Sequence, residues 1–410
     1  MCAKWNEKFD GEILAARLEG LKQKDAAGKF TDFTGFETED YFTVLESSLS
    51  FAPEIPENER RAIIRKAIFA AARKGTLTGK VILGEVSKEE NKYLNKPKKN
   101  FILVTSLSVN YFDELRNTTV NGHPIIFSRF KPKMFDRKPI MEFWRRLGIG
   151  EIPINYTSAR LSVRARDEHE AFAIGIDVLD LLRGIWNFYF TRSIGMRFSS
   201  GRTQLVNKIT LGPLHTLHLP NGKLATTETI WGEPEFVTRP AEMIGGQWER
   251  LHKFELMVRK YLRRHRYKSE VEDAIRRYTR AFDHPDLHVA FVELWSVLEK
   301  LTGTLKAKYD VTIKRTIFRY KDRDLHRQIL QHLRAFRNET VHASQRTHRI
   351  EALTFQLKGY VDSLLEFHIA NTLKFGGMEE AAQFFDFTPD KAILKTRVRE
   401  LNKAIKFLSS

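Results

Sequence analysis

The chain has 410 residues, and its 68 lysine and arginine residues outnumber its 51 aspartate and glutamate residues, giving a formal net charge of +17. Hydrophobic residues make up 42% of the sequence and charged residues 29%, which excludes a mainly disordered chain. The length favours two or three domains. The single cysteine, Cys2, excludes disulfides within the chain and cysteine-based metal sites, so we expect a reducing compartment.

The first residues contain no apolar run typical of a signal peptide, and no stretch approaches the ~18 apolar residues of a membrane span. We therefore expect a cytoplasmic protein without a membrane partner. The positive charge favours a polyanionic partner but does not say which one. It is densest in residues 241–350, which hold 24 basic and 14 acidic residues.

Residues 1–240 have a mixed pattern. The apolar spacing of residues 59–74 predicts a helix, and Asp167 with Glu170 predicts the capped start of another. Residues 88–99 look like a polar connector, and residues 201–240 like hairpins and loops. Runs rich in β-branched or alternating residues predict strands at 80–86, 101–109, 125–130 and 156–165.

From about residue 246 the pattern becomes helical, with apolar residues three and four positions apart. The predicted helices are 248–264, 269–282, 287–302, 324–343, 348–372 and 389–407. We therefore expect an α+β region in residues 1–240, possibly of two subdomains, and an all-α bundle in residues 241–410, with the boundary at 240–246.

Three residues of the predicted helix 324–343 form a candidate catalytic set. Arg337 and Asn338 are adjacent, and His342 lies one turn beyond Asn338, so all three can face one cleft. A permanently charged guanidinium, an amide and a group that titrates near neutrality suit phosphodiester chemistry. The same spacing is also common in helices that have no catalytic role.

The apolar helix before this one ends in Leu298-Glu-Lys-Leu before Gly303. Together with the Arg-Asn-x3-His set, it resembles HEPN domains, in particular the ApeA-like HEPN group, over residues 246–375. The resemblance implies a helical bundle that forms a homodimer and cuts RNA without a metal or other cofactor. It assigns Arg337 and His342 as the defining residues, Asn338 as their polar neighbour and Glu299 as the acidic residue of the preceding helix. An exposed glutamate at a helix end is the alternative for Glu299.

RNA carries its own nucleophile, the 2′-hydroxyl, so metal-free cleavage needs only proton transfer and stabilisation of charge. The resemblance implies an endoribonuclease that cuts messenger RNA or tRNA in antiviral defence or toxin-type growth arrest, with residues 1–240 in a regulatory role. A non-catalytic HEPN-like RNA-binding or dimerisation module is the main alternative. A third possibility is a toxin held inactive by a separate protein, such as an adenylylating partner.

The strongest basic run predicts an RNA-binding surface formed by Arg259, Lys260, Arg263, Arg264, Arg266 and Lys268. Tyr261 and Tyr267 are interleaved and are expected to stack on bases, although a solvated helix face fits equally well. Residues 314–315 and 319–323 would extend this surface along a loop.

Two pairs of histidines have spacing reminiscent of metal ligands. They are His284 with His288 and His215 with His218. Neither pair has a convincing third ligand, so we expect no metal site.

Overall fold

The structure, a computed structural model, describes residues 3–35, 37–146, 153, 155–192, 205–233, 235–305, 309–343 and 349–409, with the backbone alone for 309 and 341–343. This part of the chain is mixed α+β. Its helices are α1 (Gly11–Gly20), α2 (Glu37–Ser48), α3 (Glu57–Lys74), α4 (Gly79–Leu94), α5 (Lys138–Arg146), α6 (Glu168–Thr191), α7 (Trp248–Arg263), α8 (Lys268–Ala281), α9 (Leu287–Leu301), α10 (Tyr309–Ile317), α11 (Arg323–Ala343), α12 (Ile350–Ala370), α13 (Met378–Phe384) and α14 (Lys391–Leu408).

The strands are β1 (Lys4–Trp5), β2 (Lys22–Lys24), β3 (Phe30–Phe33), β4 (Leu49–Ser50), β5 (Lys99–Leu107), β6 (Thr118–Val120), β7 (His123–Ser128), β8 (Thr157–Ala165), β9 (Leu214–His218) and β10 (Trp231–Gly232). A search of the described helices finds none with the length and apolar character needed to cross a membrane.

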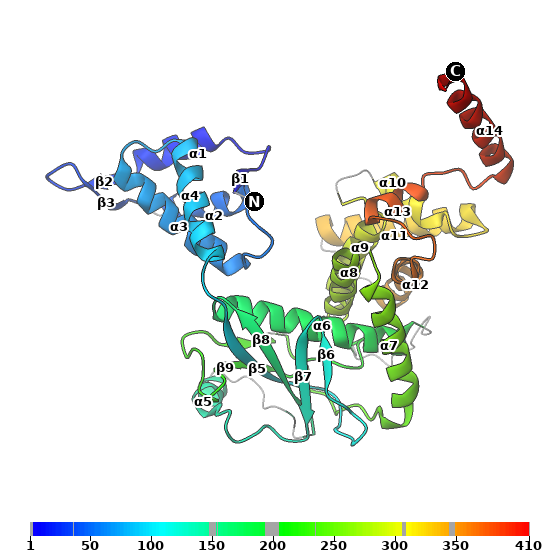
Figure 1. Cartoon of the computed structure of the whole chain (residues 1–410), viewed down its shortest axis with the longest axis horizontal. Coiled ribbons are helices and arrows are strands. Elements are labelled where there is room, and N and C mark those ends of the chain that lie inside the picture. The colour runs from blue at the N-terminus through cyan, green and yellow to red at the C-terminus, as the bar shows by residue number, and fades with distance from the viewer. Residues whose placement is uncertain are drawn as a thin grey trace.

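Helices α1–α4 form a group with its own hydrophobic core, built from residues between Ala3 and Tyr93 (Figure 1). The end of α4 contacts the rest of the chain through Arg166, which precedes α6. The Arg166 side chain donates a hydrogen bond from Nε to the carbonyl of Leu94 (3.1 Å), and its guanidinium lies over the ring of Tyr93. The N-terminal helices therefore have an independent core and a small polar attachment.

The central sheet has the strand order β10-β9-β5-β8-β7-β6, and all its neighbouring strands are antiparallel. Strands β5 and β8 pair over nine residues, and α6 lies across one face of the sheet (Figure 1). Gly175 of α6 allows this close packing, because a Cβ atom there would lie only 2.6 Å from Cδ2 of Leu103 in β5.

Helix α6 also packs against the C-terminal helices. Its Trp186 is buried and donates a hydrogen bond to Oε2 of the buried Glu255 in α7 (2.9 Å), and its Gly184 faces Thr279 of α8. One hydrophobic core consequently includes residues of the sheet, of α6 and of helices α7–α12. The boundary predicted at 240–246 lies just before α7, and this core has members on both sides of it.

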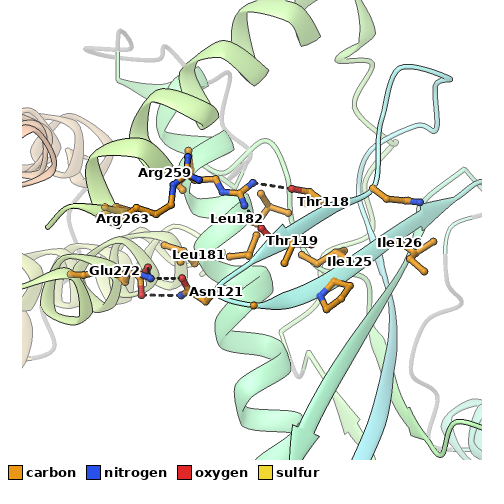
Figure 2. Close-up of a pocket in the computed structure, with 17 residues that line it drawn as sticks. Thr118, Thr119, Asn121, Ile125, Ile126, Leu181, Leu182, Arg259, Arg263 and Glu272 are labelled. Carbon is orange, nitrogen blue, oxygen red and sulfur yellow. Dashed lines mark hydrogen bonds and ion pairs between the residues drawn. The ribbon is translucent and has the colours of Figure 1, made fainter.

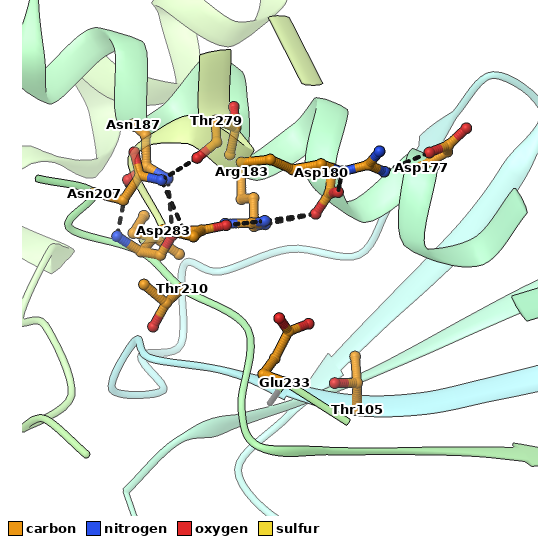
Figure 3. A network of polar contacts seen from close by, with 12 residues as sticks. Thr105, Asp177, Asp180, Arg183, Asn187, Asn207, Thr210, Glu233, Thr279 and Asp283 are labelled. Carbon is orange, nitrogen blue, oxygen red and sulfur yellow. Dashed lines mark hydrogen bonds and ion pairs between the residues drawn. The ribbon is translucent and has the colours of Figure 1, made fainter. Parts of the chain in front are cut away.

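A network of charged side chains joins α6 to the end of α8 (Figure 3). Arg183 lies between two carboxylates, with Nη2 at 2.7 Å from Oδ1 of Asp180 and 2.5 Å from Oδ2 of Asp283. Arg280 contacts the other oxygen of Asp180 at 2.6 Å. Burial by itself raises the pKa of Asp180, but the two guanidinium groups hold it below its usual value. Asp180 therefore stays ionised inside the protein, whereas burial raises the pKa of Asp283 despite its bonds to Arg183.

Most predicted elements are confirmed. The strands predicted at 101–109, 125–130 and 156–165 correspond to β5, β7 and β8, and the six C-terminal helices correspond to α7, α8, α9, α11, α12 and α14. Asp167 is the N-cap of α6, where its side chain accepts a hydrogen bond from the Glu170 amide at 2.9 Å.

The strand predicted at 80–86 and the connector at 88–99 are wrong. These residues belong mainly to α4, which begins after the N-cap Thr78 and buries Ile82, Val86 and Tyr93 on one side. A short run of valine, isoleucine and leucine fits a strand or a helix equally well, and here the longer helical period determines the outcome.

The loop predicted around residues 314–315 is also wrong, because both residues belong to α10. Arg315 donates a hydrogen bond to the carbonyl of Thr302 (2.7 Å) and pairs with Asp386 (2.6 Å). Arg315 therefore joins α10 to the segments after α9 and α13.

Candidate active site on helices α9 and α11

Helix α11 is anchored on α9 by aromatic side chains beside the candidate catalytic set. Phe336 of α11 is buried and meets Phe291 of α9 edge to face, with ring centroids 5.0 Å apart. Leu330 and Leu333 of α11 are fully buried in the same core. This packing places Arg337, the residue after Phe336, next to the surface of α9.

Glu299 lies near the end of α9 and is half-buried. The alternative of an exposed glutamate at the helix end is therefore wrong. Its Oε1 accepts a hydrogen bond from Nε1 of the buried Trp295 at 2.9 Å. Burial raises the pKa of Glu299, while the Trp295 hydrogen bond and the charge of Arg337 lower it. Glu299 and Arg337 are thus within electrostatic range of each other although they are far apart in the sequence.

Arg337 and Asn338 are both half-buried on α11, and Nη1 of Arg337 lies 3.4 Å from Oδ1 of Asn338. The helical backbone of α11 continues through His342 to Ala343, so Asn338 and His342 are one turn apart on one helix. The side chain of His342 lies outside the described residues. The structure accordingly brings together Glu299, Arg337 and Asn338 and places the backbone of His342 on the same helix.

The six residues of the predicted RNA-binding surface occupy different surroundings. Arg259 pairs with Glu255 (2.8 Å) and donates hydrogen bonds to Thr118 and Thr119, while Lys268 donates one to Asn121 (2.7 Å). The other four side chains are exposed; they are Lys260, Arg263, Arg264 and Arg266. RNA binding by these residues stays a prediction.

Stacking of Tyr267 on bases is wrong, because Tyr267 is only 3% exposed and its hydroxyl lies 3.2 Å from Nδ1 of His368 in α12. Tyr261 is 43% exposed and remains accessible. The sequence offered no local sign of this difference, since Tyr267 is buried by a helix that lies about a hundred residues further along the chain.

His368 itself forms a buried hydrogen-bonded link. Its Nε2 lies 2.8 Å from the carbonyl of Leu301 at the end of α9, so Nε2 carries a proton and Nδ1 accepts from Tyr267. Burial lowers the pKa of His368 to about 4. The imidazole is therefore neutral in the folded protein at neutral pH.

We expect this histidine to make the fold sensitive to acid. Between the unfolded-state pKa of 6.5 and the folded-state pKa of about 4, the unfolded chain binds a proton that the native state does not. As the pH falls through this window, the contribution of His368 alone should lower the free energy of unfolding by about 1.4 kcal/mol per pH unit. Urea unfolding at several pH values measures the slope, which His368→Gln should reduce and the exposed-site control His332→Gln should leave unchanged. An unchanged slope in His368→Gln would contradict the assignment.

The histidine pairs have other partners. His284 lies 3.0 Å from Glu235 and 3.2 Å from Glu293, while His288 contacts the N-cap Asp286. His215 and His218 are buried in β9. His215 contacts Thr105 and Glu233, and His218 contacts Thr216 and the carbonyl of Gly222. Within the described part of the chain, no three side chains of His, Cys, Asp or Glu gather as metal ligands.

A hairpin that was not predicted from the sequence contacts the basic run. The two-residue turn between β6 and β7 is Asn121-Gly122, and both residues have positive φ angles of 49° and 83°. Asn-Gly is a favoured dipeptide in two-residue hairpin turns, so these two residues could have predicted the turn. Its contact with α8 was not readable from the sequence.

Comparison with protein-family models, with curated proteins and with solved structures finds no match.

Proposed function

We propose that the chain is a metal-independent endoribonuclease whose active site lies where α9 meets α11. The observation that supports this proposal is the placement of Glu299 of α9 within electrostatic range of Arg337, on the helix that also contains Asn338 and His342. Glu299 is half-buried there, and Nη1 of Arg337 lies 3.4 Å from Oδ1 of Asn338. The resemblance to HEPN domains, stated above from the sequence, points to the same residues.

The proposed reaction is an intramolecular transesterification of the RNA phosphodiester. The 2′-oxygen of the RNA attacks the adjacent phosphorus, the bond from phosphorus to the 5′-oxygen breaks, and a 2′,3′-cyclic phosphate and a 5′-hydroxyl result. Arg337 binds the non-bridging oxygens and stabilises the charge that develops on them. His342 transfers a proton, because its usual pKa of about 6.5 lies near the working pH. Glu299 acts as a positioning residue for the Arg337 guanidinium.

One such set supplies one proton-transfer group, whereas the reaction needs a base for the 2′-hydroxyl and an acid for the leaving 5′-oxygen. A symmetric homodimer through the helical region would bring two His342 residues to one cleft. We therefore propose a homodimer as the active species. Cellular messenger RNA or tRNA would be the substrate, in an antiviral or toxin-type growth arrest regulated by residues 1–240.

Purified protein incubated with total RNA in the presence of EDTA tests this function. We expect cleavage to continue under these conditions and the mapped ends to be a 2′,3′-cyclic phosphate and a 5′-hydroxyl. Cleavage abolished by EDTA would contradict the metal-free reaction. RNA that binds but stays uncut under all conditions would favour a non-catalytic RNA-binding module instead.

A further inference from the structure

A cavity of about 830 Å³ lies between the β6–β7 hairpin and helices α6, α7 and α8 (Figure 2). Its volume is within the range of pockets that hold small organic ligands, roughly 300–1,000 Å³. It is separate from the candidate active site on α9 and α11, and its walls come from both the sheet region and the helical region.

The walls of this cavity are held together by polar contacts across the two regions. Nη1 of Arg259 donates a hydrogen bond to Oγ1 of Thr118 at 2.8 Å. The amide side chain of Asn121 accepts a hydrogen bond from Lys268 (2.7 Å) and donates one to Glu272 (3.0 Å). The hairpin therefore cannot move away from α7 and α8 without breaking several hydrogen bonds, so the cavity is preformed.

The charges of the lining are unevenly distributed. Arg259 and Arg263 are one turn apart on α7 (Figure 2), and Lys268 lies at the start of α8. These three cations line the helical side of the cavity together with the carboxylate of Glu272, while Glu255, outside the lining, pairs with Arg259. Arg259 and Lys268 are engaged with the hairpin, whereas the side chain of Arg263 is exposed. An anionic group entering the cavity would therefore meet Arg263.

Another part of the lining is apolar. Leu181, Leu182 and Ile185 of α6 contribute to it, together with Ile125 of β7, and Figure 2 shows Leu181, Leu182 and Ile125 around the same space. A flat ring suits this part, and the hydroxyl of Thr118 and the side-chain amide of Asn117 supply polar groups beside it. The lining thus has a basic side that can bind an anion and an apolar side with polar groups at its edge.

We propose that this cavity binds a single nucleotide, with its phosphate on Arg263 and its base against α6 and the hairpin. A nucleotide is the common metabolite class that joins an anionic phosphate to a flat ring with polar edges. Binding of a longer RNA strand would instead need cations spread along a groove. Here the cations are on one side of a cavity whose size suits one nucleotide.

The binding of AMP, GMP, CMP and UMP, and of the four triphosphates, can be measured one by one by isothermal titration calorimetry on the full chain. We expect at least one to bind, and Arg263→Ala to weaken that binding about ten- to a hundredfold, because a charge-assisted hydrogen bond to phosphate is lost. Arg264→Ala is the matched control. Arg264 is the next residue and is also exposed, but it lies outside the lining, so its replacement should change the nucleotide affinity less than about twofold.

Other outcomes would overturn the proposal. Inorganic phosphate binding as tightly as every nucleotide would show an anion site without a base pocket. Equal losses of nucleotide affinity in Arg263→Ala and Arg264→Ala would indicate non-specific attraction to a positively charged surface. Absence of nucleotide binding, with an RNA oligonucleotide whose affinity depends on Arg263, would assign Arg263 to an RNA surface instead. Because Arg263 is exposed, its replacement should not unfold the chain, and circular dichroism verifies this. The proposal does not depend on nuclease activity.

Discussion

Replacing Arg337 with alanine is expected to slow RNA cleavage by about 10²–10³-fold while leaving the fold intact. The guanidinium is proposed to stabilise the negative charge that develops on the phosphate oxygens, and removal of one such electrostatic group costs a factor of this size. Arg337 is half-buried and the neighbouring Phe336 keeps α11 anchored on α9, so the helix should remain in place. Single-turnover cleavage of a labelled RNA measures the rate.

A matched control for this variant exists on the same helix. Arg327 of α11 has a side chain that is 49% exposed, and it pairs with Asp324 of the same helix, so Arg327→Ala should cut RNA at the wild-type rate. Arg337→Lys should recover only part of the activity, because lysine keeps the charge but loses the two-pronged contact with phosphate. Equal rates in Arg337→Ala and the wild type would remove Arg337 from the mechanism. His342→Ala should be impaired to a similar or larger degree, and its full activity would exclude the proton-transfer role.

Replacing Arg183 with methionine is expected to lower the free energy of unfolding by about 3–5 kcal/mol. Arg183 is 2% exposed, and Asp180 beside it is 1% exposed (Figure 3). Without the guanidinium, Asp283 loses both of its bonds to Arg183, and Asp180 keeps only Arg280. The loss is costly because the buried Asp180, left with one of its two cations, cannot be solvated, and the partly buried Asp283 has no cation in its place. Urea unfolding followed by circular dichroism measures the loss.

Arg277→Ala is the control for the Arg183 variant. Arg277 lies on α8 and pairs with Asp273, but its side chain is 53% exposed, so its loss should cost less than about 1 kcal/mol. If both variants lost a similar amount of unfolding free energy, the buried Arg183 network would contribute no more to stability than an exposed ion pair. The double variant Arg183→Met with Asp283→Asn should lose less free energy of unfolding than the two single variants lose together, since the unpaired charge is removed with its partner.

Local patterns in the sequence were sufficient for much of the fold. The helices α7, α8, α9, α11 and α12 repeat apolar residues at helical spacing over three or more turns, and Asp167 has the residue type and position of an N-cap. Helix α4 was missed because Val81, Ile82 and Leu83 are consecutive, and three apolar residues carry no period.

Contacts between distant residues could not be read in the same way. Glu299 became a candidate through the resemblance to HEPN domains, but its half-burial depends on Trp295 and on the placement of α11 against α9. Tyr267 is exposed or buried according to where α12 lies, and the hydrogen bonds of Asn121 join positions about 150 residues apart. Such pairings depend on the topology of the whole chain, which no local spacing encodes.

Helix α6 has a further consequence for how this architecture can change in evolution. It precedes the helical region in sequence, yet it supplies part of the core of that region, through Trp186 on α7 and Gly184 on α8. Recombination that moved only α7–α12 into another protein would leave their inner faces uncovered. An inherited unit that keeps this core must therefore start before α6 and carry the sheet with it, whereas α1–α4, with their own core, can be exchanged separately.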